Sequence, residues 1–331
     1  MTSSSSAASS GSTARTPAAR LRELLSQPSI VVAPGVFDGI SARMALQAGH
    51  KALYQTGAGT SASRLARADL GFLGMSDIIG AAGVSIMADP TMMTPVIADA
   101  DTGFGTAPQV ARTVAEYHRS GIAALHIEDQ VQSKRCGHLD SKQIVSQSEF
   151  LSRITAAVHA RDSLPCSPTD RILIIARTDA LAVSGIDEAI QRLQLAAAAG
   201  ADMGFLEGMR SNSEVEQAFA QLPQGWPMMA NCVTGGKSPL WTAKEAQELG
   251  FRLAIFPCAG LFPVAKALLA SYTHLMHDGI GIEAETSKEK ALVDLGGADP
   301  MGLRNFFRDM GLEHEVEIDR LAASGAGLGD V

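Results

Sequence analysis

The sequence lacks an excess of positive charge, and it lacks long apolar runs. Its formal net charge is −8, so it has no basic footprint of the kind that phosphate binding requires. No apolar run reaches the roughly 18–20 residues that cross a bilayer. We therefore expect no nucleic-acid partner and no membrane-spanning segment.

Paired cysteine and histidine motifs are also absent. The four cysteines, at positions 136, 166, 232 and 258, show no metal-type spacing, and no secretory leader precedes them. The eight histidines include no H-E-x-x-H pair, which argues against zinc. We expect thiols without disulfide bonds in a reducing compartment, and histidines mostly in surface or packing positions.

The first 16 residues are rich in Ser, Ala and Thr. No acidic residue occurs before Glu23, whereas Arg15, Arg20 and Arg22 are present. This composition predicts a disordered tail, and it also suits an organelle transit peptide. A cytoplasmic location is expected, with a mitochondrial one as the alternative.

From residue 29 onward, short β-rich runs alternate with helical stretches. In chain order the runs are SIVVAPG, ALYQTG, PVIADAD, IAALHIED, RILIIARTDA, ADMGFLEG, WPMMANCV and RLAIFPCAG. Serial β–α units favour a parallel sheet, and residues 29–275 supply the roughly 250 residues of a closed (β/α)8 TIM-type barrel. A doubly wound open sheet is the alternative, but no dinucleotide-type glycine fingerprint follows the first run. We expect a tail over 1–16, the catalytic barrel over 17–275 and a C-terminal helical, oligomerising segment over 276–331.

Polar residues recur at the carboxyl-terminal edge of the runs. They are Asp99, Asp101, Glu128, Asp129, Arg177, Asp179, Glu207 and Asn231. A single acid in this position usually caps a helix, but several successive units with the same arrangement are hard to explain as caps. In a barrel these edges meet at one rim, where active sites are built, so the pattern predicts a site.

The chemistry of this rim allows more than one interpretation. Asp99, Asp101 and Glu128 offer only oxygen ligands, which suits Mg²⁺ or Mn²⁺ bound partly through water; capping and salt bridges to Arg177 are the alternative. Arg177 could bind a substrate carboxylate bidentately or form a structural ion pair. Cys136 lies among cations in KRCGH, which favours a thiolate in a mobile loop over the rim rather than a structural thiol.

These motifs resemble the isocitrate lyase/phosphoenolpyruvate mutase superfamily. The resemblance spans about residues 34–260 and is carried by PGVFDGISARMALQAG, YQTGAGTSAS, DADTGFG, HIEDQ…KRCGH, ARTDA and NCVTGGKSP. It implies an enzyme with the (β/α)8 barrel described above. It also implies a homotetramer in which the final helix swaps between subunits.

The resemblance further implies roles for individual residues. Mg²⁺ or Mn²⁺ would lie near Asp99, helped by Asp69, Asp101 and Glu128 largely through water. A small dicarboxylic substrate would be bound by Tyr54, Thr56, Gly57, Ala58, Arg177, Asn231 and Ser238, and the catalytic residues would be Cys136, His138, Arg177 and Glu207.

Two of these residues bear on the reaction that the resemblance implies. Cys136 favours carbon–carbon cleavage, because the phosphonomutase branch replaces that thiol. Ser238 resembles the fungal oxaloacetate hydrolases, which implies hydrolysis of oxaloacetate to oxalate and acetate; its alternative role is to cap the following helix. The alternative activity is that of a lyase acting on 2-methylisocitrate or a dimethylmalate-type acid. A phosphonomutase or a dicarboxylate-binding barrel without turnover is less favoured.

Overall fold

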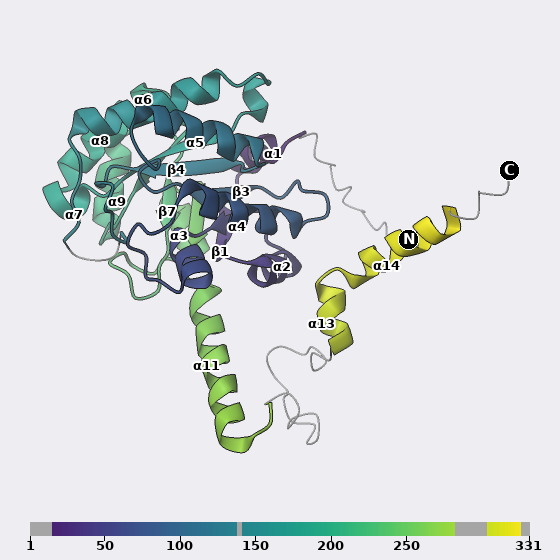
Figure 1. The fold of residues 1–331 in the computed structure, drawn as a ribbon. Coiled ribbons are helices and arrows are strands. Elements are labelled where there is room, and N and C mark those ends of the chain that lie inside the picture. The colour runs from purple at the N-terminus through teal and green to yellow at the C-terminus, as the bar shows by residue number, and fades with distance from the viewer. Residues whose placement is uncertain (1–14, 138–140, 282–302, 326–331) are drawn as a thin grey trace, which may run out of the picture. The chain divides into compact units, whose positions relative to one another are not determined.

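Each β-rich run predicted from the sequence overlaps one strand of a parallel sheet. The computed structural model describes residues 15–137, 141–281 and 303–325 (Figure 1). The strands are β1 Val31–Val36, β2 Leu53–Gln55, β3 Val96–Asp99, β4 Ala124–Glu128, β5 Leu173–Thr178, β6 Met203–Leu206, β7 Met229–Asn231 and β8 Leu253–Phe256.

The strands curl into a nearly closed barrel. Their order is β6-β5-β4-β3-β2-β1-β8-β7, so β1 pairs with β8 in parallel register. A parallel bridge between Gly204 of β6 and Met228, just before β7, joins the two ends of this row. The ring confirms the (β/α)8 barrel and excludes a doubly wound sheet, whose edge strands stay apart.

Helices follow the strands and surround the barrel (Figure 1). Several begin at residues whose side chains accept a backbone N–H of the first turn, such as Asp38, Ser146 and Thr242. The helices of this part of the chain are α1 Pro17–Ser26, α2 Gly39–Gln47, α3 Gly57–Thr60, α4 Met75–Met87, α5 Ala107–Arg119, α6 Gln147–Asp162, α7 Leu181–Ser184, α8 Ile186–Ala198, α9 Asn212–Gln221 and α10 Ala243–Glu248. A π-helical turn, Ser61–Leu65, and a 3₁₀ turn, Pro168–Asp170, complete them.

One end of the barrel interior is covered by α1. Ala18 and Leu21 of this helix are buried in one apolar cluster with Val31, Leu173 and Leu253, the first residues of three strands. Because α1 covers the amino ends of the strands, their carboxyl ends are the ones left to build a site.

The chain divides into two compact units, Met1–Leu261 and Phe262–Val331. The second holds most of α11 Leu261–Asp278, together with α13 Leu303–Asp309 and α14 Leu312–Gly325. The tail predicted over 1–16 lies almost wholly outside the described residues, and the predicted domain limits stay predictions. No described helix is both long and apolar enough to span a membrane.

Candidate active site

The polar residues predicted to mark the rim lie at the carboxyl ends of their strands. Asp99 ends β3, Glu128 ends β4 and Asn231 ends β7. Strand register places Glu128 beside Arg177 of β5, and Asp99 beside His126 of β4. The parallel barrel therefore gathers these side chains at one rim, as the sequence pattern predicts.

A small cavity lies among these strand ends. Its free space is about 60 Å³, which is room for about two water molecules. It is lined by Tyr54, Thr56, Ala58, Asp69, Asp99, Cys136, Gly137, Arg177, Glu207, Asn231, Val233, Pro257 and Cys258.

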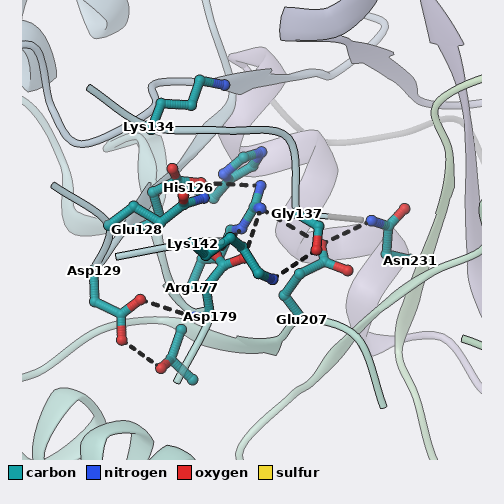
Figure 2. Close-up of polar contacts among 12 residues, drawn as sticks. His126, Glu128, Asp129, Lys134, Gly137, Lys142, Arg177, Asp179, Glu207 and Asn231 are labelled. Atoms are coloured by element: carbon teal, nitrogen blue, oxygen red, sulfur yellow. Dashed lines mark hydrogen bonds and ion pairs between the residues drawn. The ribbon is translucent and has the colours of Figure 1, made fainter. Parts of the chain in front are cut away.

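The guanidinium of Arg177 is held from several sides (Figure 2). Its Nε donates to Asp179 Oδ2 at 2.9 Å, and its Nη1 lies 3.2 Å from Glu128 Oε2. Glu207 Oε2 lies 3.7 Å from Nη2 and accepts from Asn231 Nδ2 at 2.9 Å. These contacts fix the planar donor fork at the cavity wall, where it can bind a carboxylate.

Asp179 stays ionised although it is fully buried. Burial works to raise the pKa of its carboxyl, but Arg177 and Lys142 outweigh burial and hold that pKa below its ordinary value. Lys142 Nζ donates to Asp179 Oδ1 at 2.7 Å. The negative charge on Asp179 thus pairs with two buried cations, Arg177 and Lys142.

A buried histidine lies behind the cavity lining. The ring of His126 has no exposed surface, and its Nε2 lies 2.8 Å from the hydroxyl oxygen of Tyr54 and 3.7 Å from Asp99 Oδ1. Burial lowers the pKa of His126 to about 4, so its contact with Asp99 is not an ion pair near pH 7. Burial also raises the pKa of Tyr54 well above its usual value, so the hydroxyl keeps its proton.

Asp99 is an ionised carboxylate in the cavity wall. Burial raises the pKa of this carboxyl, but the His126 ring, which is protonated in acid, and the charges of Lys134 and Arg177 together hold it well below its ordinary value. The backbone N–H of Asp101 donates to Asp99 Oδ1 at 2.9 Å. A Cβ atom on Gly57 would lie 2.3 Å from Asp99 Oδ2, so only glycine fits where α3 begins.

The other carboxylates predicted to bind a metal contact cationic side chains. Lys134 Nζ lies 2.7 Å from Asp69 Oδ1 and 2.5 Å from Asp101 Oδ1. Burial by itself would lower the pKa of Lys134, but the surrounding carboxylates raise it well above its ordinary value. In the described parts of the chain, no three His, Cys, Asp or Glu side chains are grouped as metal ligands.

The segment 134–137 forms part of the cavity wall. Cys136 is half-buried, is not disulfide-bonded, and lines the cavity; its backbone N–H donates to the Asp69 carbonyl at 3.2 Å. A Cβ atom on Gly137 would lie 2.5 Å from Arg177 Nη2, which shows how closely the segment packs on the guanidinium. His138 lies outside the described residues.

Three further residues differ in their relation to the cavity. Cys258 lines it, although the sequence gave no sign of this, and burial raises the pKa of its thiol. Cys232 is buried, and burial raises its pKa to about 11. Ser238 is half-buried in the loop after β7 and is not among the lining residues, so its predicted contact with substrate stays a prediction.

Two residues of this network were missed by the sequence interpretation. His126 was included among the surface or packing histidines, yet the two-residue period of a strand places it on the same face as Glu128. That period is a signal that could have identified it. Lys142 had no such signal, because it lies on an irregular segment and reaches Asp179 through space.

Comparisons with known proteins agree with this architecture. The family model of phosphoenolpyruvate phosphomutase matches residues 21–275. The 2,3-dimethylmalate lyase of Eubacterium barkeri is 38% identical, over 93% of this chain and 99% of its own. The 2-methylisocitrate lyase of Aeropyrum pernix is 40% identical, over 78% of this chain and 80% of its own.

A solved structure gives the same result for the fold. An oxaloacetate acetylhydrolase in complex with the inhibitor 3,3-difluorooxalacetate is 42% identical, with a TM-score of 0.84. The match covers 93% of this chain and 97% of that one. The chain therefore belongs to the phosphoenolpyruvate phosphomutase family, within the isocitrate lyase superfamily that its motifs predicted.

Proposed function

We propose that this protein cleaves a carbon–carbon bond in a small 2-oxo or 2-hydroxy dicarboxylic acid, with hydrolysis of oxaloacetate to oxalate and acetate as the leading reaction. One observation carries the proposal. A guanidinium, an ionised carboxylate and a thiol, from Arg177, Asp99 and Cys136, line the same small cavity. These groups suit a substrate carboxylate, a hard cation and proton transfer respectively.

The carboxylates of the rim fit Mg²⁺ or Mn²⁺. Asp99 is ionised and lines the cavity, and neither oxygen of the buried Glu128 accepts a hydrogen bond. Buried acceptors without hydrogen bonds are costly, and a nearby cation with its bound water would compensate them. Asp69 and Asp101 would help through water. When bound, the cation would stabilise the negative charge that develops on a substrate oxygen.

The protein's own residues would orient the substrate and move its protons. The donor fork of Arg177 would bind one carboxylate, and Thr56 and Ala58 would contact the other end of the substrate. In hydrated oxaloacetate, transfer of a hydroxyl proton from C2 to the Cys136 thiolate would let the C2–C3 bond break, with its electron pair left on C3. The Cys136 thiol would then deliver a proton to C3, which gives acetate, while C2 becomes a carboxyl carbon of oxalate.

A lyase is the second candidate, and the position of Ser238 supports it. The hydrolase assignment depends on a hydroxyl that holds the hydrated C2, yet Ser238 does not line the cavity. The relatives that act on 2,3-dimethylmalate and 2-methylisocitrate are similar over most of this chain. Cleavage of 2,3-dimethylmalate by this protein would release pyruvate and propionate, without consuming water.

Product identification separates these two reactions. Purified protein with Mg²⁺ is mixed with oxaloacetate, 2,3-dimethylmalate or 2-methylisocitrate, and the products are identified by NMR spectroscopy. Oxalate and acetate in equal amounts support the hydrolase, whereas pyruvate from the alkylated acids shows the lyase. Decarboxylation alone, or no turnover of any of the three acids, would contradict the proposal.

The Ser238→Ala substitution tests the hydrolase assignment at one residue. If the hydroxyl holds the hydrated carbon, its loss should lower oxaloacetate cleavage by a factor of about 10–150, the value of one hydrogen bond to a charged oxygen. Ser238→Thr keeps the hydroxyl and should retain part of the activity. Difluorinated oxaloacetate should inhibit the native protein more strongly than the alanine variant; equal inhibition would mean that Ser238 does not contact the substrate.

We also propose that the protein is a homotetramer, assembled through α11 as a helix exchanged between subunits. The helix is 18 residues long, and no residue in it is buried. Its exposed apolar side chains include Leu269 and Met276, which are 70% and 85% exposed. A single chain leaves this surface in water, whereas a second copy could cover it.

Leu268 and Leu269 provide a test of this assembly. Replacing both by Asp should remove about 3–6 kcal/mol of apolar burial per subunit and weaken association at least 100-fold. The matched control, Lys266→Asp, adds an acid to an exposed position of the same helix without removing apolar surface. Light scattering should give four times the 34.6 kDa chain mass for the native protein and the control. A native monomer would contradict the proposal.

A further inference from the structure

Lys142 is a buried lysine that contacts the cavity wall from outside the cavity. Its side chain is 2% exposed. Its Nζ donates to the Gly137 carbonyl at 2.6 Å and to Asp179 Oδ1 at 2.7 Å (Figure 2). A buried ammonium with two charged or polar acceptors this close has a defined position, because losing either contact would leave it unsatisfied.

Both acceptors of Lys142 are directly connected to residues that line the cavity. Gly137 follows Cys136, and it packs on the guanidinium of Arg177 so closely that a Cβ atom would overlap it. Asp179 accepts from Arg177 Nε at 2.9 Å. One ammonium therefore joins the backbone that carries the thiol to the carboxylate that orients the guanidinium.

The Asp179 side of this link is firmly held. The backbone N–H of Asp179 donates to Asp129 Oδ1 at 2.8 Å. Asp129 also accepts from Arg192 Nη1 at 3.1 Å, and its side chain has no exposed surface. Lys142 thus connects Gly137 to a part of the barrel that is held by several buried hydrogen bonds.

The Gly137 side has fewer attachments. Upstream, Gln130 bonds both the N–H and the carbonyl of Arg135, and Lys134 contacts Asp69 and Asp101. The N–H of Cys136 donates to the Asp69 carbonyl at 3.2 Å, and the carbonyl of the next residue, Gly137, accepts from Lys142. Loss of Lys142 should therefore loosen the backbone directly after the thiol, at Gly137, while Arg177 stays paired with Asp179.

We infer that Lys142 is a positioning residue, which sets the thiol of Cys136 relative to the guanidinium of Arg177 by joining the Gly137 carbonyl to Asp179. The inference rests on the proposed function for its effect on turnover, but its effect on the segment 134–137 is independent of any substrate. A displacement of about 1 Å in a reacting group can cost about 100-fold in rate.

The test compares Lys142→Met with Lys142→Gln and the native protein. Methionine has no donor, whereas glutamine keeps an amide that can donate to one acceptor. Lys244→Met is the matched control, because Lys244 is 84% exposed and far along the chain on α10. Each variant is first checked for folding by its melting temperature.

Two measurements are made on each protein. The first is the rate of trypsin cleavage after Arg135, an exposed residue next to the thiol. Loss of a hydrogen bond from a charged donor should raise this rate by a factor of about 10–150 in Lys142→Met. The second is turnover: kcat should fall about 100-fold with KM within about threefold, because Arg177 still binds the substrate. The cleavage rate and the kcat of Lys142→Gln should both lie between those of the native protein and Lys142→Met. If the methionine variant does not fold, the glutamine variant is compared with the native protein instead.

The outcomes are distinct. Faster cleavage after Arg135 together with a selective loss of kcat supports the inference. Unchanged cleavage and unchanged turnover would overturn the inference. Faster cleavage at every tryptic site, with unchanged kcat per folded molecule, would also overturn it, because that pattern indicates general destabilisation. Faster cleavage after Arg135 with a normal kcat would show that Lys142 holds the segment but does not position the thiol for turnover, which would contradict the inference. If the native protein turns over none of the diacids, the proposed function fails, but the cleavage comparison still decides whether Lys142 holds the segment.

Discussion

Removal of divalent metal should abolish carbon–carbon cleavage by this protein. The expected reason is electrostatic: a cation near Asp99 would stabilise an oxygen that becomes negatively charged as the bond breaks, and no neutral group can replace that charge. Dialysis against EDTA should reduce the rate to the uncatalysed level, and Mg²⁺ or Mn²⁺ should restore it. Full activity in metal-free protein would contradict this prediction.

Two substitutions locate the cation without relying on chelation. Both Asp99 and Asp69 line the cavity, but the Asp69 carboxylate is already paired with Lys134 at 2.7 Å. Asp99→Ala should therefore lose more activity than Asp69→Ala. Calorimetric titration with Mn²⁺ provides a measure that does not depend on turnover. Unchanged Mn²⁺ affinity in Asp99→Ala would place the cation elsewhere.

The Cys136→Ser substitution should lower turnover by a factor of roughly 10²–10⁴ while leaving the fold intact. This is the usual range for a lost acid–base group, and a serine hydroxyl is a far weaker acid than a thiol. The half-buried position of Cys136 should make the change nearly neutral for stability, so the melting temperature should stay close to native. A variant that is mainly less stable, with normal turnover per folded molecule, would show a structural thiol.

Alkylation gives an independent measure of the same thiol. Iodoacetamide reacts with the thiolate, and burial raises the pKa of Cys232 to about 11 and also raises that of Cys258. Cys136 should therefore be labelled ahead of both, and also ahead of Cys166, and oxalate with Mg²⁺ should protect it. Cys258 is the informative internal control, because it lines the same cavity.

The barrel could be predicted because its signals are local. Each strand is a short apolar run, and several runs end in polar residues such as Asp99 and Glu128, so the eightfold alternation favours a parallel ring. Strand register then follows from closure of the barrel, and it brings Glu128 beside Arg177. The predicted ends of the strands were enough to predict the rim residues.

The contacts within the rim could not be predicted in the same way. Lys134 and Lys142 lie on irregular segments, whose paths depend on tertiary contacts rather than on a period in the sequence. The sequence therefore predicted cations near Cys136, but not that Lys134 contacts Asp69 and Asp101 or that Lys142 reaches Asp179. Ser238 also lies in a loop, so its position likewise depends on tertiary contacts rather than on a period in the sequence.

A crystal structure of the native protein grown with Mg²⁺ and oxalate would test the proposed function most directly. Oxalate is both the expected product and a two-carboxylate probe of the cavity. We expect oxalate in the cavity in contact with Arg177, with the cation next to Asp99 and with Cys136 at the cavity wall. Oxalate bound away from this cavity, or a cation bound without Asp99 in a crystal that contains both, would contradict it.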